Sequence, residues 1–165
     1  MRARSKNRIT KLLLSGSLGL YFLGQPAPQT AQRSDIAILV HPATPIDNLS
    51  LNEVRKIFLG ERQYWTSKLP IELYFRAPVS RERDVVLRVI YQMTEAQYRQ
   101  YWIAKILRAE AVSSPKTVAS NEAAIELATG IPGGTVFMDV RDVRPGPKVL
   151  RVDGHLPGEP GYPLR

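Results

Sequence analysis

The segment DIAILV, residues 35–40, places five apolar residues in a row directly after Asp35. A strand with one face in water alternates apolar and polar residues, but this run leaves no polar face. It therefore predicts a strand in the interior of a sheet, with other elements packed against both faces. Pro42 and Pro45 follow at once and end the regular structure.

Capped helices separate this run from the strands that follow it. Ser50 and Glu53 form a capping box, apolar residues then recur at helical spacing, and Gly60 supplies a left-handed C-terminal cap. Further helix N-caps are predicted at Ser80, Thr94 and Ser120. Further strands are predicted within 69–78, 133–140 and 148–154. This alternation predicts an α/β fold with a small mixed or parallel sheet flanked by helices.

The first 31 residues have the pattern of a secretory signal peptide. Five cationic residues precede the apolar stretch Leu12–Gly24, which is short for a membrane span and is followed by prolines and small residues. We expect cleavage after Ala31, a folded domain at 32–153 and a loose Pro/Gly-rich tail at 154–165. The mature chain is then periplasmic or secreted, without stable membrane insertion. An uncleaved anchor helix is the alternative interpretation.

The net charge of +8 suggests a nucleic-acid partner only at first sight. Five of the positive charges belong to the leader, which has no Asp or Glu, and subtracting them leaves +3 for the rest. No dense Lys/Arg cluster with interleaved aromatic residues remains, so a nucleic-acid partner is not expected. The chain has no cysteine, and His41 and His155 are far apart in the sequence. We therefore expect no lipid anchor, disulfide, metal or other cofactor.

Five stretches follow one another in a particular order: AILVHPATPIDNLSLNEVRKIFLGERQYW, LPIELYFR, YW at 101–102, VASNEAAIEL and GIPGGTVFMD. Their order and spacing resemble the phosphate ABC-transporter substrate-binding family, and more narrowly its small single-lobe members. The resemblance spans about residues 36–139. It implies a single lobe of a type II periplasmic binding protein-like fold. It also implies a small oxyanion ligand, phosphate or sulfate, and a role beside an ABC transporter.

Larger members of that family hold phosphate in a Gly/Ser/Thr-rich turn after the strand equivalent to IELYFR. The corresponding turn here, APVSRERD at 77–84, has no glycine. A backbone cradle at close range needs glycine, so only Ser80 keeps a suitable hydroxyl. The second lobe that closes over the ligand is also expected to be missing. The alternative function is an envelope protein-interaction module that has lost ligand binding and contacts a partner protein.

The loop RAPVSRER, residues 76–83, is the candidate anion site. Its serine stands at an expected helix start, where free N–H groups and a partial positive charge attract anions. The candidate ligand-binding residues are Ser80, Arg76, Arg81, Arg83 and Thr44. The arginines add charge-assisted hydrogen bonds, and Thr44 joins from the loop after the first strand. Ordinary helix capping by Ser80, solvated arginines and an ordinary turn at Thr44 are the alternative interpretations.

The sequence does not predict an enzyme. It has no nucleophile elbow, no convincing carboxylate pair and no nucleophile beside an obvious base. Glu53 and Glu82 are explained as first-turn carboxylates that the helix dipole favours. Trp65 and the aromatic residues of YRQYW, 98–102, are expected to pack in the core, the alternatives being a ligand cleft for Trp65 and a protein-binding stripe for YRQYW. We therefore predict an exported, non-enzymatic, solute-binding-like protein.

Overall fold

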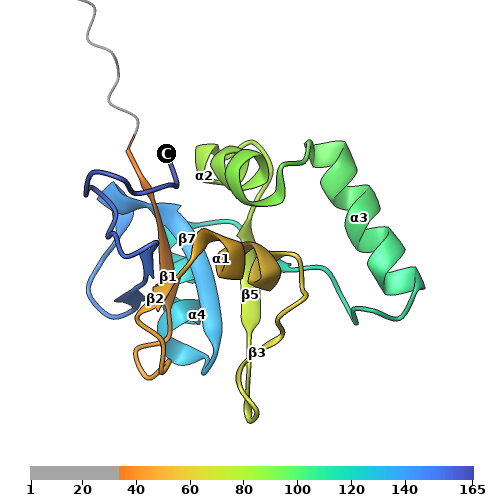
Figure 1. Ribbon diagram of the computed structural model, residues 1–165, viewed down its shortest axis with the longest axis horizontal. Helices are drawn as coiled ribbons and strands as arrows, with labels where there is room; N and C mark the ends of the chain where they lie inside the picture. Colours follow the sequence, from red (N-terminus) through yellow and green to blue (C-terminus); the bar gives the residue numbers. More distant parts are fainter. Residues whose placement is uncertain (1–33) are drawn as a thin grey trace, which may run out of the picture. The chain divides into compact units, whose positions relative to one another are not determined.

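The structure is a computed structural model that describes residues 34–165, so the predicted signal peptide at 1–31 lies outside the described residues. A mixed sheet with helices on both faces forms the centre of this part (Figure 1). The strands are β1 Ile36–Val40, β2 Asn48–Leu49, β3 Tyr64–Thr66, β4 Leu69–Pro70, β5 Glu72–Arg76, β6 Lys116–Val118, β7 Gly134–Asp139, β8 Lys148–Val149 and β9 Arg151–Val152. The helices are α1 Leu51–Phe58, α2 Arg81–Val86, the π-helix η1 Leu87–Tyr91, α3 Glu95–Leu107, α4 Asn121–Gly130 and the 3-10 helix η2 Val140–Asp142.

The central sheet has five strands in the order β6-β5-β7-β1-β8. Strand β5 runs parallel to β6 and to β7, whereas β1 runs antiparallel to β7 and to β8. The α/β fold with a small mixed sheet flanked by helices is thus confirmed. Strand β1 therefore runs in the opposite direction to β5. The C-terminal ends of β1 and β5 lie at opposite edges of the sheet.

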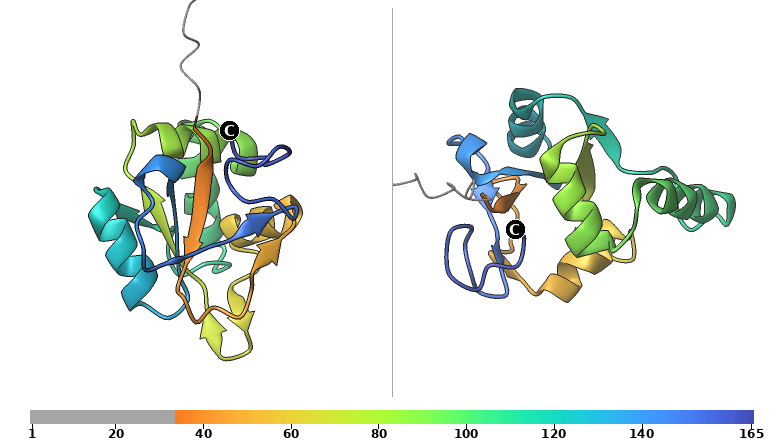
Figure 2. Two further views of the ribbon diagram at one scale, coloured as in Figure 1. Left: turned by 90° about the vertical axis from the view of Figure 1, so that its left-hand side faces the viewer. Right: turned by 90° about the horizontal axis from the view of Figure 1, so that it is seen from above.

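Strand β1 is buried on both faces, as its apolar run predicts. Ile36, Ile38 and Val40 belong to a core cluster that includes residues of α1, η1 and α3. Ala37 and Leu39 point the other way and pack with residues of α4 and β7. Figure 2 shows α4 on one side of the sheet and α1 on the other. Five consecutive apolar residues are needed here because neither face of β1 meets water.

The predicted helix caps are present. Ser50 and Glu53 make both halves of a capping box at the start of α1, and Ser80, Thr94 and Ser120 cap α2, α3 and α4. Capping depends on residues three positions apart, so it is readable from sequence alone. The structure adds one feature that the sequence did not predict, the continuation of α2 into a π-helix that ends at Tyr91.

Side chains from η1 and α3 hold the C-terminal end of α1. Tyr91 Oη donates to the carbonyl of Phe58 (2.7 Å), and both Tyr101 Oη and Lys105 Nζ donate to the carbonyl of Leu59 (2.8 Å each). These contacts satisfy carbonyl groups that have no partner inside the helix and place a cation at its negative end. Gly60 then takes φ 67° and turns the chain out of the helix.

Trp65 is a core residue, as predicted. Its side chain is 5% exposed, and Nε1 lies 3.4 Å from the carbonyl of Gly133, to which it donates. Tyr98 and Trp102 of the YRQYW stretch are buried as well. The stretch from Lys56 to Trp65 therefore ends a helix, turns at Gly60 and covers the core.

The prediction of a loose C-terminal tail at 154–165 is wrong. Tyr162 and Leu164 are buried in the core cluster that contains β1. The amide of Ile36 donates to the carbonyl of Leu164 (2.8 Å), and Tyr162 Oη donates to the carbonyl of Ile36 (2.7 Å). The prediction depended on the proline and glycine content of this segment. That content indicates where the backbone turns, but it carries no information about which residues Tyr162 and Leu164 contact.

Several short strands also differ from the sequence expectation. The predicted last strand is divided at Leu150: β8 pairs with β1, and β9 pairs in parallel with β2 in a separate two-stranded sheet. Strand β6 and the β3–β4 hairpin were not predicted, because strands of two or three residues carry too little periodicity to be detected. Within residues 34–165, no helix has both the length and the apolar character that crossing a membrane requires.

Candidate anion-binding site

The carboxyl ends of three parallel strands, β6, β5 and β7, lie side by side. They form one edge of the sheet, at right angles to the strands. The segments that follow them are 77–80, which leads into α2, the residues Ala119 and Ser120, which lead into α4, and η2. Loops at the carboxyl ends of parallel strands gather side chains and helix N-termini around one place, which is where α/β folds bind ligands. This edge contains four of the five residues that the sequence predicted.

Ser80 and Ser120 are helix caps. Ser80 Oγ accepts from the amide of Arg83 (3.3 Å), and Ser120 Oγ accepts from the amide of Ala123 (3.1 Å). The capping interpretation of Ser80 is therefore correct. A hydroxyl group that accepts in a cap still carries a proton that it can donate, so capping does not prevent either serine from contacting an anion.

The turn before Ser80 has a left-handed residue although it lacks glycine. Val79 has φ 70° and is 98% exposed. A β-branched residue rarely takes this conformation, because its Cβ substituents crowd the neighbouring carbonyl groups. The absence of glycine therefore does not prevent a glycine-like turn at this position, and the cost of that turn is local strain.

Among residues 34–165, Arg76 has side-chain donors at this edge that no acceptor pairs. The side chain is half-buried, and its Nε and Nη1 atoms are buried without a hydrogen-bond partner among residues 34–165. Buried donors in proteins are almost always paired with protein, water or a ligand, and an unpaired one is costly. Asn121, the first residue of α4, has a buried Oδ1 that also lacks a partner there, while its Nδ2 donates to Asp142 (2.9 Å).

Arg83 has a structural role. Its guanidinium binds the Glu95 carboxylate through two hydrogen bonds (2.9 and 2.8 Å) and donates to the carbonyl of Arg76 (2.6 Å). It also lies over the ring of Phe75, 4.2 Å from the ring centroid. The hydrogen bond from Arg83 lowers the pKa of Glu95, against the opposing effect of burial. Because all its nitrogen atoms are engaged, Arg83 is not available to a ligand.

Arg81 is held in place by an acidic partner that it shares with Arg141. Its guanidinium contacts Asp139 at 3.0 Å and also donates to the carbonyl of Ser34. Asp139 receives further hydrogen bonds from Arg141 and from the hydroxyl of Ser34. Burial by itself raises the pKa of the Asp139 carboxyl, but these hydrogen bonds outweigh burial and hold that pKa below its usual range. The cluster joins the start of β1, the start of α2 and the end of β7.

Thr44 does not join this site, which corrects the sequence prediction. Val40, at the end of β1, lies opposite Thr135, and Thr135 lies beside Leu73 near the start of β5. The loop after β1 is therefore at the other edge of the sheet from Arg76. The prediction failed because it assumed that β1 runs parallel to β5. Thr44 is 2% exposed, and its carbonyl accepts a hydrogen bond from Lys148.

Sequence reasoning missed the acidic partners and the contribution of α4. Asp139 and Glu95 are distant in sequence from the arginines that they neutralise, and no local pattern connects them. Glu122 also lies near: its pKa is lowered by its own backbone amide, by Ser120 and, to a smaller extent, by the charge of Arg76. The edge is thus a mixed-charge surface in which Arg76 keeps unpaired donors.

No protein-family model and no curated protein matches the chain. Solved structures do. One, assigned as a phosphate ABC transporter substrate-binding protein from Clostridium perfringens and solved with bound phosphate, has 18% identity and a TM-score of 0.59 over 73% of this chain and 46% of that one. An ABC-type phosphate transport receptor from Vibrio cholerae has 18% identity and a TM-score of 0.59 over 75% of this chain and 48% of that one. PstS from Borrelia burgdorferi has 19% identity and a TM-score of 0.63 over 79% of this chain and 54% of that one.

This likeness establishes the fold. At 18–19% identity the structures share an architecture with the chain, which spans about half of their length. The chain therefore has a periplasmic binding protein-like α/β fold, in agreement with the expectation from its sequence.

Proposed function

We propose that the chain is an exported, non-enzymatic, solute-binding-like protein that holds a small oxyanion at the carboxyl ends of β5 and β6. The observation that carries this proposal is Arg76, whose Nε and Nη1 donors are buried and lack an acceptor among the described residues. Two of the similar structures support it, since they are described as phosphate transport proteins and one of them contains phosphate.

The ligand class follows from the donors. A guanidinium group offers a planar fork that matches two oxygen atoms of a tetrahedral oxyanion such as phosphate or sulfate. The hydroxyls of Ser80 and Ser120 stand at the starts of α2 and α4, where backbone N–H groups add partial positive charge. Arg81 and Arg83 act indirectly in this proposal, because their carboxylate partners fix them as parts of the scaffold.

The affinity of such a site is expected to be low. Glu122 and Asp142 lie close to the donors, and their carboxylates oppose an anion. We expect a dissociation constant on the order of 0.1–1 mM for phosphate. Binding is expected to weaken with added salt, since an open site is screened by ions.

In the cell envelope, a domain of this kind would present its anion to an ABC transporter, as the names of the similar structures suggest for those proteins. The chain covers only about half of each of them. We therefore propose a binding role and assign no transport step to residues of this chain.

Isothermal titration of the full chain with phosphate and with sulfate at low ionic strength tests the proposal. Arg76→Gln removes the charge and keeps much of the side-chain volume, so it is expected to abolish detectable binding. Lys68→Gln is the control for loss of a surface charge, because Lys68 is exposed in the turn between β3 and β4, at the other end of β5 from Arg76, and it is expected to leave binding unchanged. Equal binding by wild type and Arg76→Gln, or no binding by wild type at millimolar anion, would refute the proposal.

A further inference from the structure

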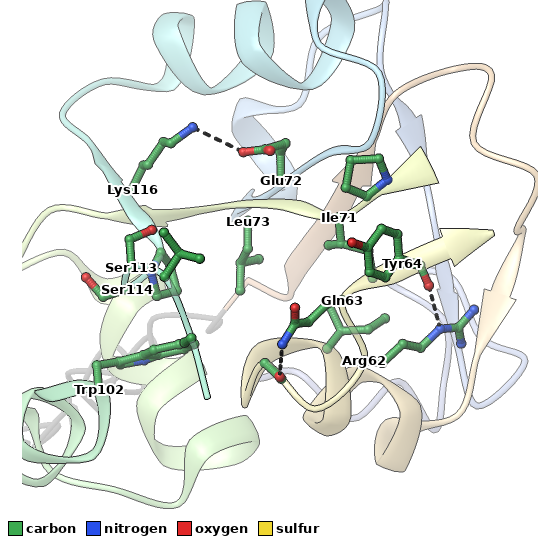
Figure 3. A pocket seen from close by; sticks show the side chains of 16 residues that line it. Arg62, Gln63, Tyr64, Ile71, Glu72, Leu73, Trp102, Ser113, Ser114 and Lys116 are labelled. Carbon is green, nitrogen blue, oxygen red and sulfur yellow. Dashed lines mark hydrogen bonds and ion pairs between the residues drawn. The ribbon is translucent and has the colours of Figure 1, made fainter. Parts of the chain in front are cut away.

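The two ends of strand β5 differ in how their charged side chains are paired. A cavity of about 250 Å³ lies at the N-terminal end (Figure 3). The charged groups that line it are engaged, Arg62 with Glu53 (3.6 Å) and Lys116 with Glu72 (3.1 Å). Their charges are thus balanced within the chain and do not select a charged ligand. Polar atoms without a partner lie instead at the C-terminal end, beside the start of α4.

Arg76, the last residue of β5, points towards the N-terminal end of α4. Side chains alternate along a strand, so Arg76 lies on the same face as Tyr74, which packs with Val118 and Ala124 beneath α4. Arg76 is in register with Val118, and Asn121 follows three residues later as the first residue of α4. The side chains of Arg76 and Asn121 therefore lie at the same end of this helix.

Both side chains carry buried polar atoms that lack a partner among residues 34–165. Those of Arg76 are the donors Nε and Nη1, and that of Asn121 is the acceptor Oδ1, so the two side chains do not bond to each other. Nδ2 of Asn121 donates to Asp142 (2.9 Å), which fixes the orientation of the amide group. A fully ionised oxyanion can accept from Arg76 but has no hydrogen to donate to Oδ1. A ligand that satisfies both groups therefore has an acceptor and a donor.

Two carboxylates flank this acceptor. Glu122 follows Asn121 in the first turn of α4 and is exposed. Its pKa is lowered by its own backbone amide, by Ser120 and, to a smaller extent, by the charge of Arg76. Asp142 accepts the hydrogen bond from Asn121 with one of its two oxygen atoms. Neither carboxylate forms an ion pair with another residue of the described part of the chain.

We propose that the ligand of this site is a small zwitterion, in which a short linker joins a tetrahedral oxyanion to a primary ammonium group. The oxyanion would accept from Nε and Nη1 of Arg76, and the ammonium would donate to Oδ1 of Asn121. Glu122 and Asp142 then gain a role, because carboxylates that oppose a simple anion attract an ammonium group. This inference rests on the proposed function, since it uses the same anion site, and it adds the class of compound.

The test compares two phosphate monoesters of the same size. O-phosphoethanolamine carries the ammonium group, and propyl phosphate has a methyl group in its place. Each is titrated into the full chain at about pH 8, where both monoesters are dianions and the amine is protonated, with inorganic phosphate as the reference. Calorimetry and the shifts of the backbone amides of Asn121 and Glu122 report binding. We expect phosphoethanolamine to bind about tenfold more tightly than propyl phosphate, since it adds a charged hydrogen bond.

Glu122→Gln supplies a readout that a general loss of structure cannot imitate. It is expected to weaken the binding of phosphoethanolamine about threefold and to strengthen that of propyl phosphate by a similar factor, so that the preference nearly disappears. Glu126→Gln is the matched control, because Glu126 is exposed on the same helix one turn further from its N-terminal end. It is expected to change either affinity by less than about twofold.

The possible failures can be told apart. Propyl phosphate that binds as tightly as phosphoethanolamine would overturn this inference and leave the anion site standing. A Glu122→Gln variant that binds both monoesters equally less well than wild type would overturn it too, because the ammonium group would then not face Glu122. If inorganic phosphate and both monoesters fail to bind at about 5 mM, the proposed function and this inference fail together.

A zwitterion of this kind can be a free compound or a lipid head group. Glycerophosphoethanolamine, whose phosphate is a diester as in a lipid, distinguishes the two sources. Binding as tight as that of phosphoethanolamine would support a head group, and binding weaker by about tenfold would support a free monoester, because the diester has lost one negative charge towards Arg76. Either result supports the zwitterion.

Discussion

Arg83 offers the sharpest test of how the arginines at the end of β5 divide their roles. The substitution Arg83→Met keeps a long apolar stem over Phe75 and removes the guanidinium. It deletes two hydrogen bonds to Glu95 and one to the carbonyl of Arg76. The Glu95 side chain is 32% exposed and regains water, which reduces the value of that pair to about 1 kcal/mol. The unpaired carbonyl of Arg76 costs about 1–3 kcal/mol.

The expected loss is therefore about 2–4 kcal/mol in the free energy of unfolding. Urea denaturation followed by far-UV circular dichroism measures it, with Lys68→Gln as a surface control. A variant whose stability lies within about 0.5 kcal/mol of wild type would refute the structural role of Arg83. If phosphate binding were lost while stability stayed unchanged, Arg83 would be a ligand residue, contrary to its pairing with Glu95.

The pH dependence gives a second readout of the same pair. The hydrogen bond from Arg83 lowers the pKa of Glu95 in the folded protein from its ordinary value of 4.5. A carboxyl whose pKa is lower in the folded state adds stability above its unfolded pKa, and this stability is lost as pH falls through the lowered value. The stability difference between wild type and Arg83→Met is therefore expected to shrink below about pH 4.5. A difference that stays constant down to about pH 2 would contradict this assignment.

Three further substitutions test other features. Trp65→Ala is expected to cost about 3–5 kcal/mol in denaturant unfolding, the range for large buried aromatic residues, and a loss below about 1 kcal/mol would contradict core packing. Gly60→Ala is expected to cost about 1–2 kcal/mol, because its φ is 67° and a Cβ would lie 3.0 Å from Trp102, and an unchanged melting temperature would argue against this turn. Val79→Gly is expected to raise stability by up to about 1 kcal/mol through relief of the left-handed valine. A clear destabilisation would show that the entropy which glycine adds to the unfolded chain outweighs this strain.

The features that the sequence predicted correctly depend on neighbours along the chain. The apolar run of β1 requires two covered faces wherever its partners come from, and both core clusters indeed include it. Ser80 and Gly60 act on groups within a few residues of themselves, so their roles as caps were readable. Arg76 was also placed correctly, at the end of a strand and near a helix start.

The features that the sequence did not predict depend on direction and on distant partners. A strand has the same composition in either direction, so nothing in β1 reveals that it opposes β5, and Thr44 was assigned to the wrong edge. Arg81 and Arg83 looked available because their partners, Asp139 and Glu95, lie 58 and 12 positions away. Local sequence patterns predict the helices and strands, whereas the tertiary fold decides which charged groups pair with one another.

The pairing of β1 also determines when the chain can fold. Its registered partners begin with Thr135, in β7, and the contacts of Ile36 extend to Leu164. The first strand of the domain therefore has no partner in β7 until residues 135–139 have been synthesised, and contacts this far apart in sequence form slowly. A polypeptide leaving the ribosome would keep its most apolar strand unpaired. Synthesis would thus leave an interval during which a chaperone can bind the unpaired strand.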